Sequence, residues 1–197
     1  MTAAAAERFG ERTALVDGPV RLSYAELFEE ARTFAAALVA SGVEAGDRVS
    51  IWAPNHAEWI VAVLGLLQAG AVLVPVNTRF KGAEAADLLI RSHAKVLVTV
   101  TDFLDTDYLA MLEGTGADLP DLETVVVARG DAPDDTVGWD AFLSRATDEA
   151  RATVDQRRAA LGPRPVERRA GDRLMTTVEP VEIAQRDHAA AQAGRDR

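Results

Sequence analysis

The sequence predicts an α/β fold, in which a mostly parallel sheet carries helices on both faces. The main indication is a buried strand, an apolar helix and a second buried strand in succession. Arg48–Ala53 (RVSIWA) is short, β-branched and apolar, which is typical of a strand covered on both faces. Ala71–Val76 (AVLVPV) has the same character and follows Gly70, a natural helix stop. Two such strands joined by a helix predict a right-handed βαβ unit.

The helix between these strands is predicted to begin at His56. Pro54 cannot donate a hydrogen bond to a sheet, and Asn55 can cap the helix in a capping-box pattern. Apolar residues wrap most of the helix surface, so we expect other layers to enclose it. Trp59–Thr78 also lacks formal charge over about the length of a membrane span, but glycines, polar residues and a proline interrupt it. The sheet interpretation is therefore favoured over a membrane span.

Composition excludes several classes of function. At 197 residues the chain can bury a core of its own. Its formal net charge of −10 argues against general nucleic-acid binding and against attraction to anionic membranes. The sequence has no cysteine, which excludes disulfides, thiolate metal sites and a cysteine nucleophile. A cytoplasmic location fits, since charges occupy the N-terminal stretch where a signal peptide needs an apolar core.

The first forty residues predict an arm, a hairpin and a long helix. Met1–Arg12 is a frayed helix or arm, and Thr13–Val16 and Val20–Leu22 flank an Asp-Gly-Pro turn, as in a β-hairpin. Ser23–Glu26 (SYAE) is a capping box, and apolar residues recur behind it at spacings of three and four. This pattern predicts an amphipathic helix that ends near Gly42 and packs on the sheet by one face.

Helices and strands continue to alternate, as in a doubly wound sheet. The expected elements are a helix over Gly82–His93, a strand over Lys95–Val100, a short helix over Tyr108–Glu113, a strand over Thr124–Ala128 and a bent helix from Trp139 through Arg158. Residues 1–161 are therefore predicted to form one α/β subdomain. Residues 162–197 are rich in arginine and alanine and contain no aromatic residue, so we predict a tail that is disordered or read off-frame.

Several local phrases resemble the start of an acyl-CoA synthetase of the AMP-forming, adenylate-forming family. They span Ala14 to Leu161 and are Leu22–Leu27 (LSYAEL), Gly42–Val43 through Gly46–Val49, Pro54–Asn55, Ala69–Ala71, Pro75–Arg79 and Glu84. Each phrase alone is weakly specific, whereas all of them in this order and spacing form a strong signal. Gly138–Asp140 is in addition similar to CoA ligases of bacterial steroid degradation.

The resemblance implies a ligase reaction in two steps, and a fold equivalent to the first subdomain of the family's large N-terminal domain. A small carboxylic acid attacks the α-phosphate of ATP to give an acyl-adenylate, and the thiol of CoA then displaces AMP. ATP, CoA and Mg²⁺ are the cofactors so implied for the intact family member. Beyond Pro163 the sequence lacks the family's phosphate loop ending in Lys-Gly, its Tyr-Gly-x-Thr-Glu motif, its ribose-binding aspartate and its C-terminal lysine. We therefore expect an N-terminal fragment with no catalytic residues, inactive alone.

The place where the resemblance stops leaves several hypotheses open. From Arg164 onward the sequence fits nothing in the family and looks like off-frame translation of GC-rich DNA, which suggests a truncated or frameshifted synthetase. Alternatively, the chain is a free-standing CoA-binding or protein-interaction module that docks on a complementing C-terminal portion. An unrelated doubly wound regulatory domain is disfavoured, because the strand ends carry no acidic cluster.

Arg79 is the candidate cofactor-binding residue. It follows a predicted strand at its carboxyl end, where ligands collect in open α/β sheets. Its planar guanidinium can pair with phosphate, and the resemblance implies that the matching arginine helps to hold the nucleotide phosphates of CoA. A surface arginine that fixes the Asn77–Thr78 turn explains the residue equally well.

The remaining polar residues favour structural roles over chemistry. A neutral histidine at a helix start can cap or face solvent, and one at a helix end suits the helix dipole. The aspartates after the third long strand lack the glycine and glutamate of a calcium loop, so loop capping is preferred. The serines have no histidine and aspartate beside them for a triad. These residues are His56, His93, Asp102, Asp105, Asp107, Ser23 and Ser50, and they predict no metal site and no catalytic residue.

Overall fold

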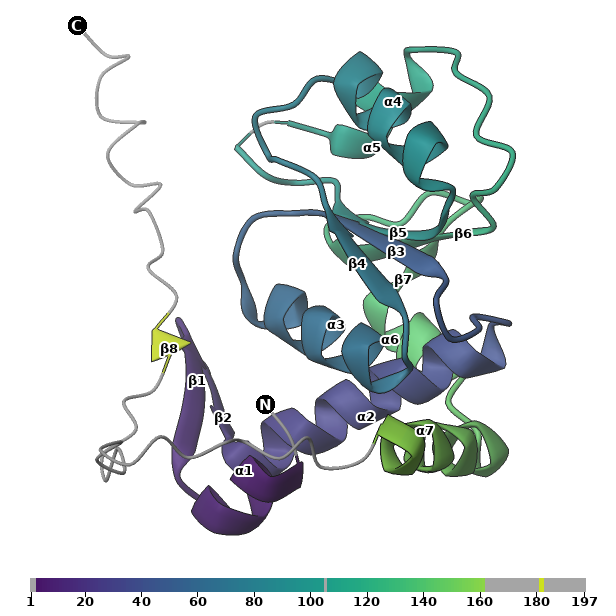
Figure 1. Cartoon of the computed structure of the whole chain (residues 1–197). Coiled ribbons are helices and arrows are strands. Elements are labelled where there is room, and N and C mark those ends of the chain that lie inside the picture. Colours follow the sequence, from purple (N-terminus) through teal and green to yellow (C-terminus); the bar gives the residue numbers. More distant parts are fainter. Residues whose placement is uncertain (1–2, 105, 162–180, 183–197) are drawn as a thin grey trace, which may run out of the picture.

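A five-stranded sheet forms the centre of the molecule (Figure 1). The computed structural model describes residues 3–104, 106–161 and 181–182. All neighbouring strands of this sheet are parallel, in the order β4-β3-β5-β6-β7. The strands are β3 (Arg48–Trp52), β4 (Val72–Pro75), β5 (Ala94–Val100), β6 (Thr124–Arg129) and β7 (Val137–Gly138). The predicted α/β class with a parallel sheet is confirmed.

Helices cover both faces of the sheet (Figure 1). On one face lie α4 (Gly82–Ser92) and α5 (Tyr108–Glu113), and on the other lie α3 (Ala57–Gln68) and α6 (Trp139–Leu143). A further layer is formed by α2 (Tyr24–Ala40), which packs on α3, with α7 (Asp148–Leu161) packed on α2. None of the described helices is both long enough and apolar enough to cross a bilayer.

The N-terminal hairpin belongs to a separate small sheet, ordered β2-β1-β8. After α1 (Ala3–Phe9), β1 (Thr13–Asp17) and β2 (Val20–Ser23) pair antiparallel, which confirms the predicted hairpin. β8 (Val181–Glu182) pairs with β1 in parallel. Apart from β8, the predicted tail over 162–197 lies outside the described residues. No backbone pairing joins this small sheet to the large one among the residues described.

Helix α2 begins as predicted but packs differently. Ser23 and Glu26 form the capping box, with Glu26 N donating to Ser23 Oγ and Ser23 N donating to Glu26 Oε2. Phe34–Leu38, however, are all buried in succession, so this half of the helix has no solvent face. The prediction that α2 packs on the sheet by one face was wrong, because α3 separates α2 from the sheet and α6 and α7 cover its other sides.

Strand β4 is an edge strand, and the prediction that it is a buried strand was wrong. Val72 is 48% exposed, and none of the four residues of β4 is fully buried. The apolar composition of the strand resembles that of a central strand, and only the strand order reveals its position. Pro75 fits the edge, since a residue without an N–H is tolerated where no further strand pairs.

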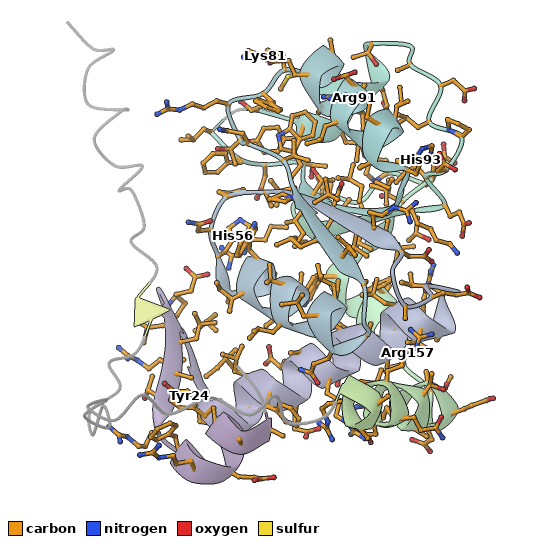
Figure 2. The ribbon with its side chains drawn as sticks, viewed as in Figure 1. Tyr24, His56, Lys81, Arg91, His93 and Arg157 are labelled. Carbon is orange, nitrogen blue, oxygen red and sulfur yellow. The ribbon has the colours of Figure 1, made fainter. Side chains whose placement is uncertain are left out.

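The predicted bent helix over Trp139–Arg158 is two helices. Thr147 separates them and caps α7 by accepting a hydrogen bond from Ala150 N. Polar contacts then hold α7 in place: Arg157 donates to the carbonyl oxygens of Val43 and Ala69, each at the end of a helix (Figure 2). Arg32 of α2 forms two hydrogen bonds to Asp155, so α7 is fixed by charge as well as by its small buried residues.

Replacing Gly65 tests the close approach of α2 and α3. A Cβ at Gly65 would lie 2.7 Å from the carbonyl oxygen of Ala31 and 2.8 Å from Phe34 Cδ1. We expect Gly65→Ala to lower the free energy of unfolding by about 3 kcal/mol, because a backbone must move to admit the methyl group.

The matched control is Gly138→Ala, where the nearest atom to an added Cβ is 3.8 Å away and the backbone φ is negative. Its cost should stay below about 1 kcal/mol in urea denaturation. Equal losses in the two variants would contradict this packing.

Candidate functional site

Two groups of polar residues lie at the carboxyl edge of the large sheet, where open α/β folds bind ligands. The first is the loop after β4, residues 77–81, here named the Arg79 loop. The second is an ion cluster of Asp17, His56, Glu58 and Arg129, here named the Arg129 cluster. Its members come from the end of β1, the start of α3 and the end of β6.

Two buried aromatic residues fix the backbone of the Arg79 loop. Trp52 Nε1 donates to the carbonyl oxygen of Asn77 at 3.2 Å, and Tyr108 Oη donates to that of Thr78 at 3.1 Å. The rings of Trp52 and Tyr108 stack, with 4.6 Å between centroids. Because the two side chains donate to consecutive carbonyl groups, they hold the backbone of the loop in place at the end of β4.

The side chain of Arg79 projects from this fixed loop. Asn77 makes the turn, because its Oδ1 accepts a hydrogen bond from Arg79 N at 2.9 Å. The guanidinium of Arg79 is exposed and forms no hydrogen bond or ion pair with the other described residues. Lys81, at the start of α4 (Figure 2), adds a second exposed cation. The side chain of Arg79 therefore does not fix the turn, and its role in CoA binding stays a prediction.

The Arg129 cluster joins segments that are distant in sequence. Arg129 Nη2 lies 2.6 Å from Asp17 Oδ2 and 2.8 Å from Glu58 Oε2, and its Nε donates to the same Glu58 oxygen at 2.9 Å. Asp17 is only 2% exposed. A buried carboxylate of this kind is costly unless it is paired, and Arg129 supplies the charge. Sequence reasoning missed the cluster, since its partners are 71 and 112 residues apart.

Asp17 also caps α3, and the prediction that Asn55 does so was wrong. The helix starts at Ala57, with His56 in the N-cap position, and the His56 side chain makes no capping hydrogen bond. Instead, Asp17 Oδ2 accepts a hydrogen bond from Ala57 N at 3.0 Å. The cap comes from the hairpin, 40 residues earlier, while Asn55 is exposed. A carboxylate here also interacts favourably with the helix dipole.

His56 is buried within this cluster, although the sequence suggested that it caps the helix or faces solvent. It is 8% exposed and sits where α3 begins (Figure 2). Its Nδ1 lies 3.7 Å from Glu58 Oε2 and has no hydrogen-bond partner among the described residues. Burial, followed by the nearby positive charge of Arg129, lowers the pKa of His56 below its ordinary value. The imidazole is therefore neutral at pH 7.

The other predicted site residues have structural roles or none. Asp107 caps α5 by accepting hydrogen bonds from Leu109 N and Ala110 N, which agrees with the loop-capping prediction. His93 ends α4 in a left-handed conformation and contacts Asp121 at 2.9 Å. Ser50 is buried in β3, and Asp105 lies outside the described residues. Within the described ranges, no group of three histidine or acidic side chains could hold a metal ion.

A hollow between α1, α2 and α3 is too small for a nucleotide cofactor. Its volume is about 10 Å³, room for about one water molecule, whereas ligand pockets usually hold about 300 Å³ or more. Mostly apolar side chains line it, among them Tyr24, Phe28 and Leu64. The exposed cations of the carboxyl edge are therefore better placed than this hollow to meet a charged ligand.

Comparison with known proteins assigns a family. The model of a family described as AMP-binding enzyme matches residues 2–190. The chain is 46% identical over 162 residues to "3-[(3aS,4S,7aS)-7a-methyl-1,5-dioxo-octahydro-1H-inden-4-yl]propanoyl:CoA ligase" of Rhodococcus jostii, covering 81% of the chain and 32% of the relative. The same-named ligase of Mycobacterium tuberculosis is 42% identical, with 79% and 30% covered. The chain thus spans about a third of the length of these relatives.

Solved structures agree with the fold. The anthranilate CoA ligase AuaEII, in complex with anthranoyl-AMP, superposes with a TM-score of 0.65 at 25% identity. The match covers 71% of this chain and 26% of that one. The subdomain described above is therefore the arrangement found in part of a larger CoA ligase.

Asp17→Asn tests whether the Arg129 cluster holds the fold together. The substitution keeps the shape but removes the charge that pairs with Arg129, so we expect a loss of about 3 kcal/mol in the free energy of unfolding. Asp87→Asn is the control, because Asp87 forms an exposed ion pair with Arg91 on one helix and should cost less than about 0.5 kcal/mol. Chemical denaturation at pH 7 measures both, and similar losses would contradict the role of Asp17.

Proposed function

The chain belongs to the AMP-binding enzyme family, and on this premise we propose that it forms the first α/β subdomain of an acyl-CoA ligase. Family members use ATP and CoA. The observation that carries the proposal is the family match over residues 2–190, combined with coverage of only 32% of the Rhodococcus relative. The remaining two thirds of such a ligase would supply the chemistry.

The residues present do not fit ATP or Mg²⁺. The sequence lacks the family's phosphate loop beyond Pro163, and the described residues offer no set of three acidic or histidine side chains for a cation. Clamping the triphosphate requires backbone amides, a metal ion and a cation placed together. We therefore propose that this chain does not form an acyl-adenylate by itself.

A bicyclic propanoate, the acid activated by the two relatives named above, is the proposed substrate class of the intact ligase. The support is overall identity, at 46% and 42%. The Gly138–Asp140 motif agrees with this assignment as a sequence resemblance, and two of its residues also have structural roles. Gly138 stands at the N-cap of α6, and the ring of Trp139 stacks on Phe34 with 5.1 Å between centroids.

Arg79 is the proposed contact for the phosphates of CoA. Its guanidinium is exposed and unpaired within the described residues, and it projects from a backbone fixed by Trp52 and Tyr108. Because the backbone of the loop is already fixed, ordering on anion binding is limited to the side chain. Lys81 lies two residues away and can add to the positive potential.

The alternative function is a module that docks on a complementing C-terminal portion. Apolar residues of α3 and β4 that are not fully buried favour it: Leu67 is 51% and Val72 48% exposed, and Trp59, Ile60 and Val63 are half-buried. Apolar surfaces of this kind mark interaction sites. Pro75 removes a donor from the outer edge of β4, so a partner would pack on side chains rather than add a strand.

An adenylation assay tests the proposal that the chemistry lies elsewhere. We expect no release of pyrophosphate above the protein-free blank when the purified chain is incubated with Mg²⁺, ATP and the bicyclic propanoate. The full-length Rhodococcus ligase is the positive control, and a medium-chain fatty acid is the substrate control. Acid-dependent pyrophosphate release by the chain alone would refute the proposal.

Arg79→Ala tests the CoA contact. Losing a charge-assisted hydrogen bond to phosphate should weaken CoA binding about tenfold, corresponding to about 1.4 kcal/mol. Arg91→Ala is the matched control, since Arg91 is also exposed but pairs with Asp87 on α4, and its affinity should equal that of the wild type. Calorimetric titration of CoA measures both. Unchanged affinity in Arg79→Ala, or no CoA binding by the wild type, would contradict the proposal that Arg79 contacts CoA.

A further inference from the structure

The Arg129 cluster contains one neutral base among charged groups. The groups that face His56 come from four elements: Glu58 on its own helix, Arg129 at the end of β6, Asp17 at the end of β1, and Asp102 after β5. The carboxylates favour a positive charge on His56, whereas burial and Arg129 oppose it. In the folded arrangement the opposition prevails, so proton uptake by His56 favours states in which the cluster is open.

Glu58 is placed so that His56 and Arg129 compete for it. Its Oε2 accepts hydrogen bonds from Arg129 and lies 3.7 Å from His56 Nδ1. A protonated imidazole carries an N–H on both nitrogens, so Nδ1 would become a charged donor facing this oxygen. A small movement would bring the two atoms to hydrogen-bond distance and leave two cations, His56 and Arg129, on one carboxylate oxygen.

The group affected next is Asp17. It is paired by Arg129 and caps α3 through Ala57 N. A cationic His56 that shares Glu58 would weaken the network in which Arg129 holds the 2% exposed carboxylate of Asp17, and a buried carboxylate is costly when its pairing weakens. The least costly response is for the end of β1 to move toward water, which breaks the contact between the hairpin and α3.

We propose that the Arg129 cluster is a pH-sensitive contact that holds the β1–β2 hairpin on α3 and weakens when His56 takes up a proton. Nothing in the AMP-binding assignment requires this contact, and it does not depend on whether CoA binds at Arg79. The hairpin keeps its hydrogen bonds to the start of α2, such as Tyr24 N to Arg12 O, so the expected change is a local opening.

The sign of the pH dependence follows from proton linkage. His56 titrates near 6.5 in an open, solvated state and lower in the closed one. The open state therefore binds more protons below about pH 6.5, and the closed contact is fully stable above that pH and loses stability as the pH falls through it. At pH 5.5, one unit below the open-state pKa, the population of the open state rises by at most about tenfold.

Hydrogen exchange of the hairpin tests this inference. Exchange of amides in residues 13–23 is measured by mass spectrometry at pH 7.5 and 5.5 and corrected for the intrinsic exchange rates. We expect protection to fall by about three- to tenfold at pH 5.5 in the wild type and to stay constant in His56→Gln. His93→Gln is the matched control, because His93 is an exposed histidine paired with Asp121, and it should behave like the wild type.

Equal pH dependence in His56→Gln and the wild type would overturn the proposal, as would constant protection in the wild type. If His56→Gln does not fold, the imidazole of His56 is titrated in the wild-type chain by NMR, with its signal assigned by comparison with His93→Gln and His188→Gln, since the chain has three histidines. A folded-state pKa at or above 6.5 would then overturn the proposal, and a lower one would support it.

Discussion

The carboxylate of Asp17 joins three parts of the molecule that lie far apart in the sequence. It takes the positive charge of Arg129 from the end of β6 and the first free amide of α3. Since the described strands of the two sheets share no backbone pairing, this buried contact fixes how the hairpin sits against the sheet. A buried charge without its partners is costly, so the three segments must assemble together. The position of α2 follows, because α2 begins directly after the hairpin.

Short-range patterns predicted the elements well. The capping box at Ser23–Glu26, the boundaries of α5 and the strand cores of β3 and β5 depend on residues a few positions apart, and the sequence displays them directly. The predictions that failed concern features that depend on contacts between residues distant in the sequence. The edge position of β4 follows from strand order, and the complete burial of Phe34–Leu38 follows from the helices around α2. Neither feature leaves a periodic pattern in the sequence. An apolar strand has the same composition at the edge of a sheet as at its centre, and an apolar helix has the same composition whether one side or all sides are covered.

The candidate site likewise contains features that local sequence predicted and features that only the fold reveals. Arg79 was proposed as a site residue because it follows a predicted strand, in a motif that resembles those of CoA ligases. The residues that fix its loop act over 25 and 30 positions, and only the fold shows that Trp52 and Tyr108 donate to successive carbonyl groups. For the Arg129 cluster the sequence held one signal that was not used: an acidic residue ends β1 and a basic one ends β6, each after an apolar strand. Opposite charges at two strand ends are a reason to expect an ion pair.

The order of the strands in the sheet has a consequence for synthesis on the ribosome. β3 emerges first, β4 then joins one side of it and β5 the other, β6 joins β5, and β7 joins β6. Every strand thus finds its neighbour already synthesised, and no strand must wait for a segment that is made later. Parallel pairing is slow when its partners are far apart in the chain, and this order keeps the intervening loops short. The subdomain can accordingly acquire its sheet by Gly138 while later sequence is still inside the exit tunnel.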